Sequence, residues 1–357
     1  MNNVYNILTI HREPNYGALL QAYALYKIIE AHGGKPNIIN LSLQYRNKSF
    51  TPIHRLLMWV YNKYKGYDYC FKHARRFFET YATYRTKPFY TLDQLKEYVW
   101  NPEESYILGS DQVWNPFITG KLSKAFTFEF LPWNCNKVYT YASSFGFITN
   151  EEERFQVLNI ASFSKRFRLI SVRESFGVDY LAKYNCQAIE VIDPTLLIDS
   201  YHHLLPREPD DVDIVLQLAL GESKSMDAAV KKISNRMGIP IEKYYGYLQP
   251  SRSINRQFLS VNDWLYKIAS SRLIITDSFH AIVFCILFQR EFYYYSSHPN
   301  KNTRIENLLS RLGIMNRIIS DVESIDFKSA IDYTEVNHKL SELRKSSLAY
   351  IKSILAQ

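Results

Sequence analysis

RLIITDSFHAIVFCILF, residues 272–288, is the stretch that decides the fold class of this chain. Residues 272–276 form a short apolar run rich in β-branched side chains, which predicts a buried strand. A polar turn follows at residues 277–280, and residues 281–288 predict a buried helix. Because a strand that leads through a polar turn into a helix is the building block of a parallel sheet, this stretch predicts an α/β fold.

The same unit recurs earlier and later in the chain. Residues 4–10 predict a strand, residues 14–17 a turn, and residues 18–32 a helix that ends at a pair of glycines. With a second strand at residues 37–41, the opening is a β-turn-α-β unit, so the first domain is Rossmann-like. Further strands are predicted at residues 105–109, 137–141, 168–172, 189–194, 214–218 and 292–295, and further helices at residues 226–237, 264–271 and 305–312.

Length and composition favour two domains. At 357 residues the chain exceeds the size at which one hydrophobic core usually keeps growing. Residues 205–211, LPREPDD, have the proline and charge density of a linker. We therefore place a first domain at residues 1–204 and a second at residues 205–334, followed by a final helix at residues 335–357 that packs back on the first domain.

Cysteine usage, apolar runs and missing motifs exclude several classes of protein. The four cysteines have no paired spacing, which argues against a zinc cluster, a redox CxxC site and a disulfide framework. No signal peptide is visible, and the longest apolar runs fall short of the roughly 18 residues that span a bilayer. The motifs GxGxxG, HExxH and GxSxG are missing. We therefore expect a soluble cytoplasmic protein without a metal or a cofactor.

Residues 51–90 are a basic aromatic insertion. They contain eight lysines and arginines against two acidic residues, within a chain whose formal charge is +8, and many Trp, Tyr and Phe side chains. One interpretation is a solvated helical pair whose aromatic side chains pack inward. Another is peripheral contact with an anionic membrane surface. Nucleic acid is not expected as a partner, because no nucleic-acid motif accompanies the charge.

Polar turns follow several predicted strands. In open α/β sheets, ligands bind outside the carboxyl ends of the strands, so the turns after residues 105–109, 137–141 and 168–172 should line one site. Ser110 and Asp111 follow the first of these strands. The carboxylate of Asp111 suits an acid or a base, with the Ser110 hydroxyl alongside; the alternative is an Asx turn that caps a helix.

Two further candidates lie in the first domain. Arg173 follows the strand at residues 168–172, and its planar guanidinium suits bidentate binding of a carboxylate or phosphate. The alternative is a surface ion pair between Arg173 and Glu174. Near the amino terminus, Asn15 and Gly17 resemble a loop that brings backbone close to a ligand, since glycine adopts conformations that other residues avoid.

The turn at residues 277–280 precedes a helix. The first N–H groups of a helix and its partial positive charge suit a phosphate or carboxylate. Asp277 or Ser278 caps this helix, and Phe279 and His280 follow. A single histidine before an apolar helix is more often structural than catalytic, so these residues alone leave the role of His280 open.

Taken in order, five motifs resemble the polysaccharide pyruvyl transferase family. They are NYGALLQAYAL at residues 15–25, GSDQVW at residues 109–114, SVRE at residues 171–174, DPT at residues 193–195 and TDSFH at residues 276–280. The resemblance covers roughly residues 4–315 and leaves out the basic aromatic insertion and the final helix. Ala281 stands where many members of the family have glycine.

The resemblance implies a fold and an activity. The implied fold has two Rossmann-like domains facing across a cleft, the GT-B-like architecture of glycosyltransferases. The implied activity moves a pyruvyl group from phosphoenolpyruvate onto two hydroxyls of one sugar in a cell-surface polysaccharide precursor and makes a cyclic ketal. Arg173 and His280 would hold the donor, and Ser110 and Asp111 would face them.

The chemistry suggests roles for these residues. Protonation of the donor's methylene carbon creates oxocarbenium character at the adjacent carbon, which a sugar hydroxyl attacks before phosphate leaves. We hypothesise that Arg173 grips the carboxylate or phosphate, that His280 binds phosphate or donates a proton, and that Asp111 receives the acceptor's proton; acid and base could also be exchanged. The substrate-binding candidates are Asn15, Gly17, Ser110, Ser278, Phe279 and Arg304. Lys301 could add positive charge, and for it and Arg304 the alternative is a solvated surface role.

Two other functions stay open at the level of sequence. One is a GT-B-type glycosyltransferase that uses a nucleotide-sugar donor. The other is a non-catalytic protein that docks on a membrane surface through the basic aromatic insertion. If this insertion docks, a lipid-linked sugar acceptor at the inner face of the membrane is the natural inference.

Overall fold

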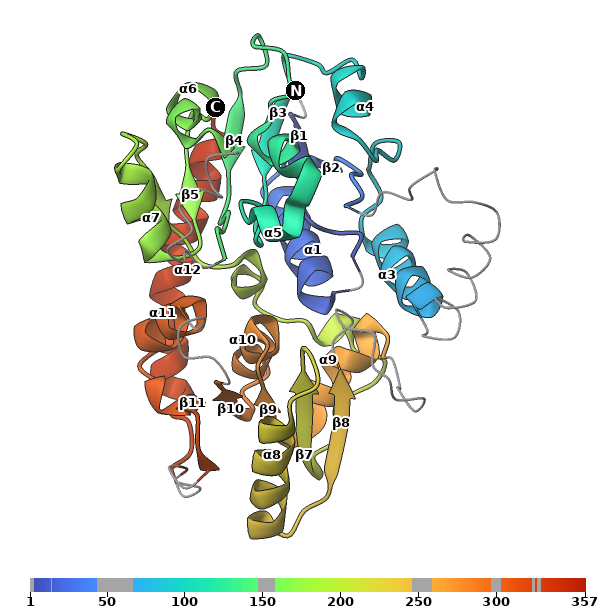
Figure 1. Ribbon diagram of the computed structural model, residues 1–357, viewed down its shortest axis with the longest axis vertical. Helices are drawn as coiled ribbons and strands as arrows, with labels where there is room; N and C mark the ends of the chain where they lie inside the picture. Colours follow the sequence, from blue (N-terminus) through green and yellow to red (C-terminus); the bar gives the residue numbers. More distant parts are fainter. Residues whose placement is uncertain are drawn as a thin grey trace.

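The computed structural model describes residues 3–13, 15–43, 67–146, 158–245, 259–296, 303–322, 325 and 329–357. Pro14, Lys301 and residues 51–66 of the basic aromatic insertion lie outside the described residues. The chain forms two α/β units with parallel sheets, one above the other in Figure 1.

The upper unit in Figure 1 is built on a parallel sheet with the strand order β2-β1-β3-β4. Its strands are β1 (Val4–Leu8), β2 (Lys35–Ile38), β3 (Ser105–Leu108) and β4 (Val138–Thr140). Isolated parallel bridges, Tyr139 to Leu169 and Ser143 to Val172, continue it towards the pair β5 (Ser171–Val172) and β6 (Ile189–Glu190). The α-helices of this unit are α1 (Tyr16–Ala31), α3 (Tyr67–Tyr81), α4 (Leu92–Lys96), α5 (Pro116–Thr119), α6 (Phe163–Arg166) and α7 (Ser175–Ala182).

The lower unit has a five-stranded parallel sheet in the order β11-β10-β9-β7-β8. Its strands are β7 (Val212–Ala219), β8 (Ile241–Tyr245), β9 (Ser271–Thr276), β10 (Glu291–Tyr295) and β11 (Ile318–Ile319). Its helices are α8 (Lys224–Met237), α9 (Val261–Ser270), α10 (Phe279–Leu287), α11 (Thr303–Leu312) and α12 (Tyr333–Leu355). The prediction of an α/β protein with two Rossmann-like domains is confirmed.

Capping side chains explain why two helices begin earlier than the apolar pattern predicts. Helix α1 begins at Tyr16 rather than at residue 18, because the side chain of Asn15 accepts a hydrogen bond from the N–H of Ala18 at 3.2 Å. Helix α10 includes Phe279 and His280, because Ser278 is its N-cap. Periodicity of apolar residues identifies the body of a helix, whereas the cap determines its first turn.

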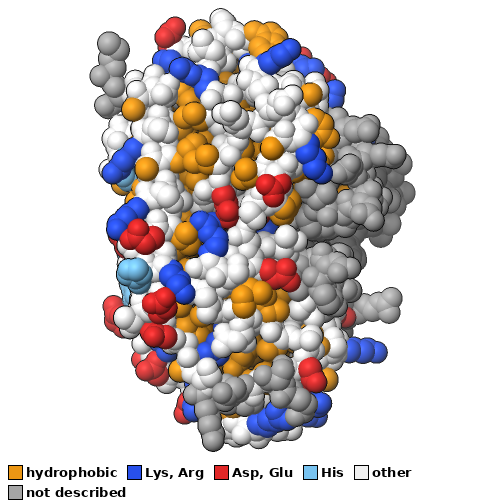
Figure 2. Space-filling model, turned by 90° about the vertical axis from the view of Figure 1, so that its left-hand side faces the viewer, with side chains coloured by type: hydrophobic (Ala, Val, Ile, Leu, Met, Phe, Trp, Pro, Cys, Tyr) orange, Lys and Arg blue, Asp and Glu red, His pale blue; other side chains and the backbone are white. Residues whose placement is uncertain are grey.

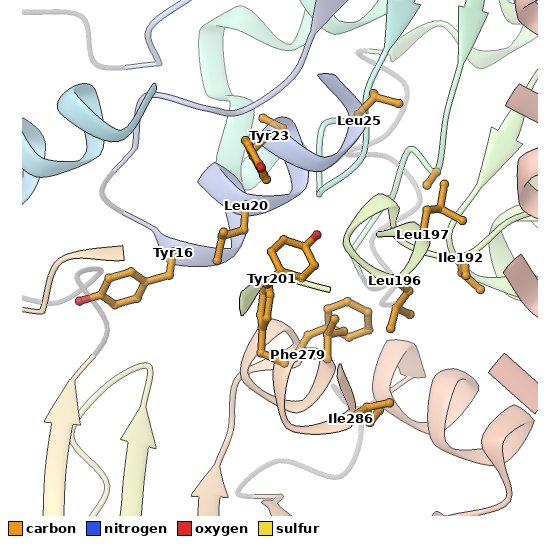
Figure 3. Close-up of a cluster of buried hydrophobic side chains, with 14 of the residues drawn as sticks. Tyr16, Leu20, Tyr23, Leu25, Ile192, Leu196, Leu197, Tyr201, Phe279 and Ile286 are labelled. Atoms are coloured by element: carbon orange, nitrogen blue, oxygen red, sulfur yellow. The ribbon is translucent and has the colours of Figure 1, made fainter. Parts of the chain in front are cut away.

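The two units share an apolar contact region, which joins the amino-terminal ends of α1 and α10. Tyr201 lies between these helices (Figure 3), with its ring centroid 4.9 Å from that of Phe284. The Tyr16 ring stacks on Trp264 at 4.9 Å, and its hydroxyl donates to the carbonyl of Leu259 at 2.8 Å. The start of α1 is therefore held against the second unit by both apolar packing and a hydrogen bond.

Helix α12 extends from the second unit to the first. The hydroxyl of Tyr350 donates to the carbonyl of Thr140 at 2.9 Å, and the N–H of Ile192 donates to Ser347 Oγ at 3.1 Å. These two hydrogen bonds fix the second unit against the sheet of the first.

Figure 2 shows the face of the molecule on the left-hand side of Figure 1, where acidic and basic side chains are intermixed.

The described part of the basic aromatic insertion contains helix α3. Phe77 and Phe78 are buried, and the Phe77 ring lies 5.7 Å from the ring of Tyr23 on α1. Lys72 and Arg76 are exposed on the same helix. Among the residues that the structure describes, there is no helix with the length and apolar character needed to cross a membrane.

Candidate active site

The turn between β9 and α10 is fixed by hydrogen bonds at both ends. Thr276 Oγ1 donates to the carbonyl of Leu218 at 2.7 Å and accepts from the N–H of Ser278 at 3.0 Å. Ser278 Oγ in turn accepts from the N–H of Ala281 at 3.4 Å. Asp277 does not cap the helix: its carboxylate accepts from the N–H of Leu220 at 2.7 Å, and burial raises its pKa. This turn therefore sets where His280 lies.

His280 belongs to the second unit, but its ring lies against the first. The residue is only 8% exposed, and Nε2 is 3.6 Å from Asp193 Oδ2, beyond hydrogen-bonding distance. On the other side of the ring, a Cβ on Gly17 would overlap Nδ1. The glycine at the start of α1 is therefore what allows His280 to approach this closely.

Asp193 is the buried carboxylate at the centre of the site. It is the N-cap of the short 3-10 helix η4 (Pro194–Leu197), and Oδ1 accepts from Thr195 N at 3.0 Å and from Thr195 Oγ1 at 2.6 Å. Its Oδ2 accepts from Ser110 Oγ at 3.0 Å and from Arg173 Nη1 at 2.7 Å. Burial alone would raise the pKa of Asp193, but interactions with His280, Arg173 and Thr195 hold it well below its usual range.

Arg173 is buried among three carboxylates. Beside the Asp193 contact, its Nε lies 3.8 Å from Glu174 Oε2 and its Nη2 lies 4.0 Å from Asp111 Oδ1. Arg173 is 6% exposed and Glu174 is 0% exposed, so the alternative of a surface ion pair is wrong. A buried guanidinium must be paired to offset its desolvation, and these acids supply the pairing.

Asp111 has an unusual backbone conformation. Its φ angle of 74° lies in the left-handed region, which non-glycine residues seldom adopt. The carbonyl of Asp111 accepts from the N–H of Val113 at 2.8 Å and of Ser144 at 3.0 Å, and these bonds hold the strained conformation. Asp111 thus sits beside Arg173, whereas the neighbouring Ser110 is fully buried and turned towards Asp193.

Glu174 is a second acidic residue whose importance is not visible in the sequence. Its Oε1 accepts from Ser144 Oγ at 2.6 Å and from the N–H of Phe145 at 3.1 Å. Burial raises the pKa of Glu174, although the charge of Arg173 opposes this shift. The sequence indicates Glu174 only as a surface partner of Arg173 and assigns no role to Asp193. The signals for Asp193 are its place at the end of the predicted strand at residues 189–194 and the DPT motif at residues 193–195.

The ring of Phe279 contacts two arginines that come from different units. The guanidinium carbon of Arg173 is 4.7 Å from the centre of the Phe279 ring, and that of Arg304 is 5.9 Å from it. Both distances are typical of cation–π contacts. Arg304 is half-buried on α11, and burial together with the nearby Arg173 lowers its pKa. The site therefore gathers two cations around one aromatic ring.

Several buried polar atoms in this cluster have no hydrogen-bond partner among the described residues. They are Arg173 Nε and Nη2, Glu174 Oε2 and His280 Nε2. An unsatisfied buried polar group costs about 1–3 kcal/mol, so native proteins seldom keep several together without a function. In the described ranges, His, Cys, Asp and Glu side chains form no group of three that could hold a metal ion. The free donors are suited to an anionic ligand.

The sequence comparison decides the family. A sequence profile of the polysaccharide pyruvyl transferase family matches residues 15–299, most of the chain. This chain belongs to the polysaccharide pyruvyl transferase family. It is therefore a transferase. The matched range includes Gly17, Asp111, Arg173, Asp193 and His280, while Arg304 follows it.

Solved structures show that this pyruvyl transferase has a GT-B-like fold. The S. aureus MnaA structure with UDP superposes with a TM-score of 0.56 at 12% identity, over 100% of this chain and 97% of that one. The Methanocaldococcus jannaschii UDP-GlcNAc 2-epimerase gives a TM-score of 0.54 at 10% identity, over 100% of both chains. An alpha-glucosyltransferase in complex with UDP and DNA gives 0.51 at 9% identity, over 97% of this chain and 91% of that one. No curated protein matches the sequence.

Gly17→Ala should displace His280 and lower pyruvyl transfer, because the new methyl group overlaps the imidazole ring. A displacement of about 1 Å in a catalytic group costs roughly 100-fold in rate. Steady-state turnover of the variant measures this loss.

Gly177→Ala is the matched control for this substitution. It also adds a methyl group to a buried helical glycine, but that methyl would lie 3.3 Å from Val172, a contact that needs only a small adjustment. Turnover of the control should stay close to wild type. Equal turnover in both variants would show that the position of the His280 ring next to Gly17 does not matter for transfer.

Proposed function

We propose that this transferase moves a pyruvyl group from phosphoenolpyruvate to two hydroxyls of a sugar in a cell-surface polysaccharide precursor and forms a cyclic ketal. The observation that carries the proposal is the buried guanidinium of Arg173, which has two nitrogen atoms without a hydrogen-bond partner and lies in one cluster with His280. Phosphoenolpyruvate carries a phosphate and a carboxylate, and both need cationic or N–H donors in a site of low dielectric constant.

The donor's two anionic groups have complementary partners in this site. The free Nε and Nη2 of Arg173 suit one of them in a bidentate arrangement. Arg304, His280 Nε2 and the amino-terminal end of α10 suit the other. Phe279, which both guanidiniums contact, offers an apolar surface to the methylene group. Ser278 and Asn15 act indirectly, since they cap α10 and α1, and Gly17 leaves room for the His280 ring.

The transfer requires one acid and one base. An acid adds a proton to the methylene carbon, and the first sugar hydroxyl bonds to the adjacent carbon as it loses its own proton. The phosphate group then leaves, and the second hydroxyl bonds to the same carbon. One hydroxyl proton balances the proton that was added to carbon, and the other leaves with phosphate. We assign the acid to His280 and the base to Asp111, whose side chain is on the Nη2 side of Arg173.

Phosphoenolpyruvate should raise the melting temperature of the wild-type protein, whereas a UDP-sugar should not. A ligand at 100 times its dissociation constant stabilises a protein by about 2.7 kcal/mol. Arg173→Ala should weaken donor binding by about 2 kcal/mol or more, and Arg304→Ala should weaken it as well. Lys345→Ala removes an exposed cation of α12 and serves as the control. A melting shift with the UDP-sugar alone would favour a glycosyltransferase instead.

Asp111→Asn should abolish most transfer and leave donor binding intact, because the amide keeps the shape of the side chain but cannot accept a proton. General-base catalysis contributes roughly 100- to 10,000-fold. Mass spectrometry of the glycan product measures transfer, and calorimetry with phosphoenolpyruvate measures binding. Asp179→Asn, the same change at an exposed residue of α7, is the control. Unchanged turnover of Asp111→Asn would exclude the base role.

We further propose that the acceptor is a lipid-linked oligosaccharide and that the enzyme contacts the anionic inner face of the membrane through the basic aromatic insertion. Exposed Lys72 and Arg76 on α3 support this proposal. Their aromatic neighbours Phe77 and Phe78 are buried, so in this helix charge rather than apolar insertion would provide the contact.

The protein should sediment with phosphatidylserine vesicles at low salt. The double variant Lys72→Glu and Arg76→Glu should bind less, since each basic residue near such a surface contributes about 1 kcal/mol. Neutral phosphatidylcholine vesicles are the control. Equal sedimentation of the wild type and the double variant would remove α3 from the contact, and the absence of any binding would remove the membrane proposal.

A further inference from the structure

We infer that Asp193 is a positioning residue that holds Arg173 of the first unit and His280 of the second in one arrangement. This inference rests on the proposed function, because it assigns His280 a part in pyruvyl transfer. No other described carboxylate lies within 4 Å of both of these side chains: Asp193 Oδ2 lies 2.7 Å from Arg173 Nη1 and 3.6 Å from His280 Nε2.

The two oxygens of the Asp193 carboxylate have different tasks. Oδ1 is occupied by Thr195, which donates through its backbone N–H and its hydroxyl. These two bonds fix the rotation of the carboxylate, because both come from a short 3-10 helix that follows directly in the chain. Oδ2 is consequently directed at Ser110, Arg173 and His280. One oxygen anchors the side chain and the other faces the site.

The Oδ2 atom connects residues that lie far apart in the chain and in different units. Ser110 follows β3, Arg173 follows β5, and His280 lies in the first turn of α10. The imidazole of His280 has Gly17 on its Nδ1 side and Asp193 on its Nε2 side. The first unit thus confines the ring from two directions, and the negative charge on the Nε2 side is that of Asp193.

A carboxylate is required in this position for an electrostatic reason. Arg173 Nη1 and Ser110 Oγ both donate to Oδ2 of Asp193. A protonated His280 imidazole would be a third hydrogen-bond donor near this oxygen. Asparagine at position 193 could still accept from Thr195 through its carbonyl. Its NH2 group would then face Arg173 and His280, so that donors would oppose donors. Asp193→Asn therefore removes the attraction with little change of shape.

A double-mutant cycle tests whether Asp193 acts through His280. The four proteins are the wild type, Asp193→Asn, His280→Gln and the double variant, and kcat for pyruvyl transfer from phosphoenolpyruvate is measured for each. We expect Asp193→Asn to lower kcat about 30-fold or more in the wild-type background, but only several-fold in the His280→Gln background, where the loss that passes through Arg173 remains, since residues that act as a unit are not additive. The same fold-loss in both backgrounds would overturn the inference.

An NMR measurement keeps the inference testable where turnover is too low to measure. The imidazole nitrogen signal of His280 is assigned by its absence from the His280→Gln variant. We expect this signal to move in Asp193→Asn and to stay in place in Asp179→Asn, the same change at an exposed residue of α7. An unmoved signal in a folded Asp193→Asn protein would overturn the inference.

Ser110→Ala serves if Asp193→Asn does not fold. This variant removes one neutral donor from Oδ2 and keeps the charge, so it should lower kcat several-fold and shift the His280 signal, whereas Ser346→Ala, the same change at an exposed residue of α12, should do neither. Identical behaviour of these two variants would overturn the inference. Failure of the proposed function gives a different result: a wild-type protein that transfers nothing from phosphoenolpyruvate, or a His280→Gln variant with full activity.

Discussion

The buried pair between Asp193 and Arg173 is the interaction on which the rest of the site depends. Burial of either charge alone would be strongly unfavourable, and the pair is maintained because further donors and acids surround it. Asp193 also accepts from Ser110 and Thr195, and Arg173 is also close to Glu174 and Asp111. Such networks rigidify their members when they are satisfied. Here they leave two nitrogens of Arg173 without a hydrogen-bond partner, and these are the atoms that we propose for the anionic donor.

The junction of the two units forms the candidate site as well as part of the fold. The amino-terminal ends of α1 and α10 meet there, with Tyr201 packed between them (Figure 3). Gly17 lets the His280 ring approach α1, and helix α12 ties the second unit to the first through Tyr350. The site residues come from both units, so the relative placement of the units controls the distances in the site.

The fold and the family could be predicted from the sequence, because both rest on local patterns. Apolar runs of strand length, helical spacing and polar turns identify the parallel α/β units, and the ordered motifs identify the family. Arg173, Asp111 and His280 could also be predicted, because each of them follows a predicted strand. The roles of Asp193 and Glu174 could not be predicted, because an Asp before Pro has the pattern of a turn and a Glu after Arg has the pattern of a surface pair.

By itself, the sequence determined the order of strands and helices, the polar turns at strand ends, and the residues with charges suited to a donor. Only the tertiary structure decided which of those charges are buried and which face one another. Asp193 meets Ser110 across 83 residues of chain, and it meets His280 across the boundary between the two units. The reason is physical: local propensities depend on neighbouring residues, whereas burial and ion pairing depend on how distant segments pack, and no spacing along the chain encodes those distances.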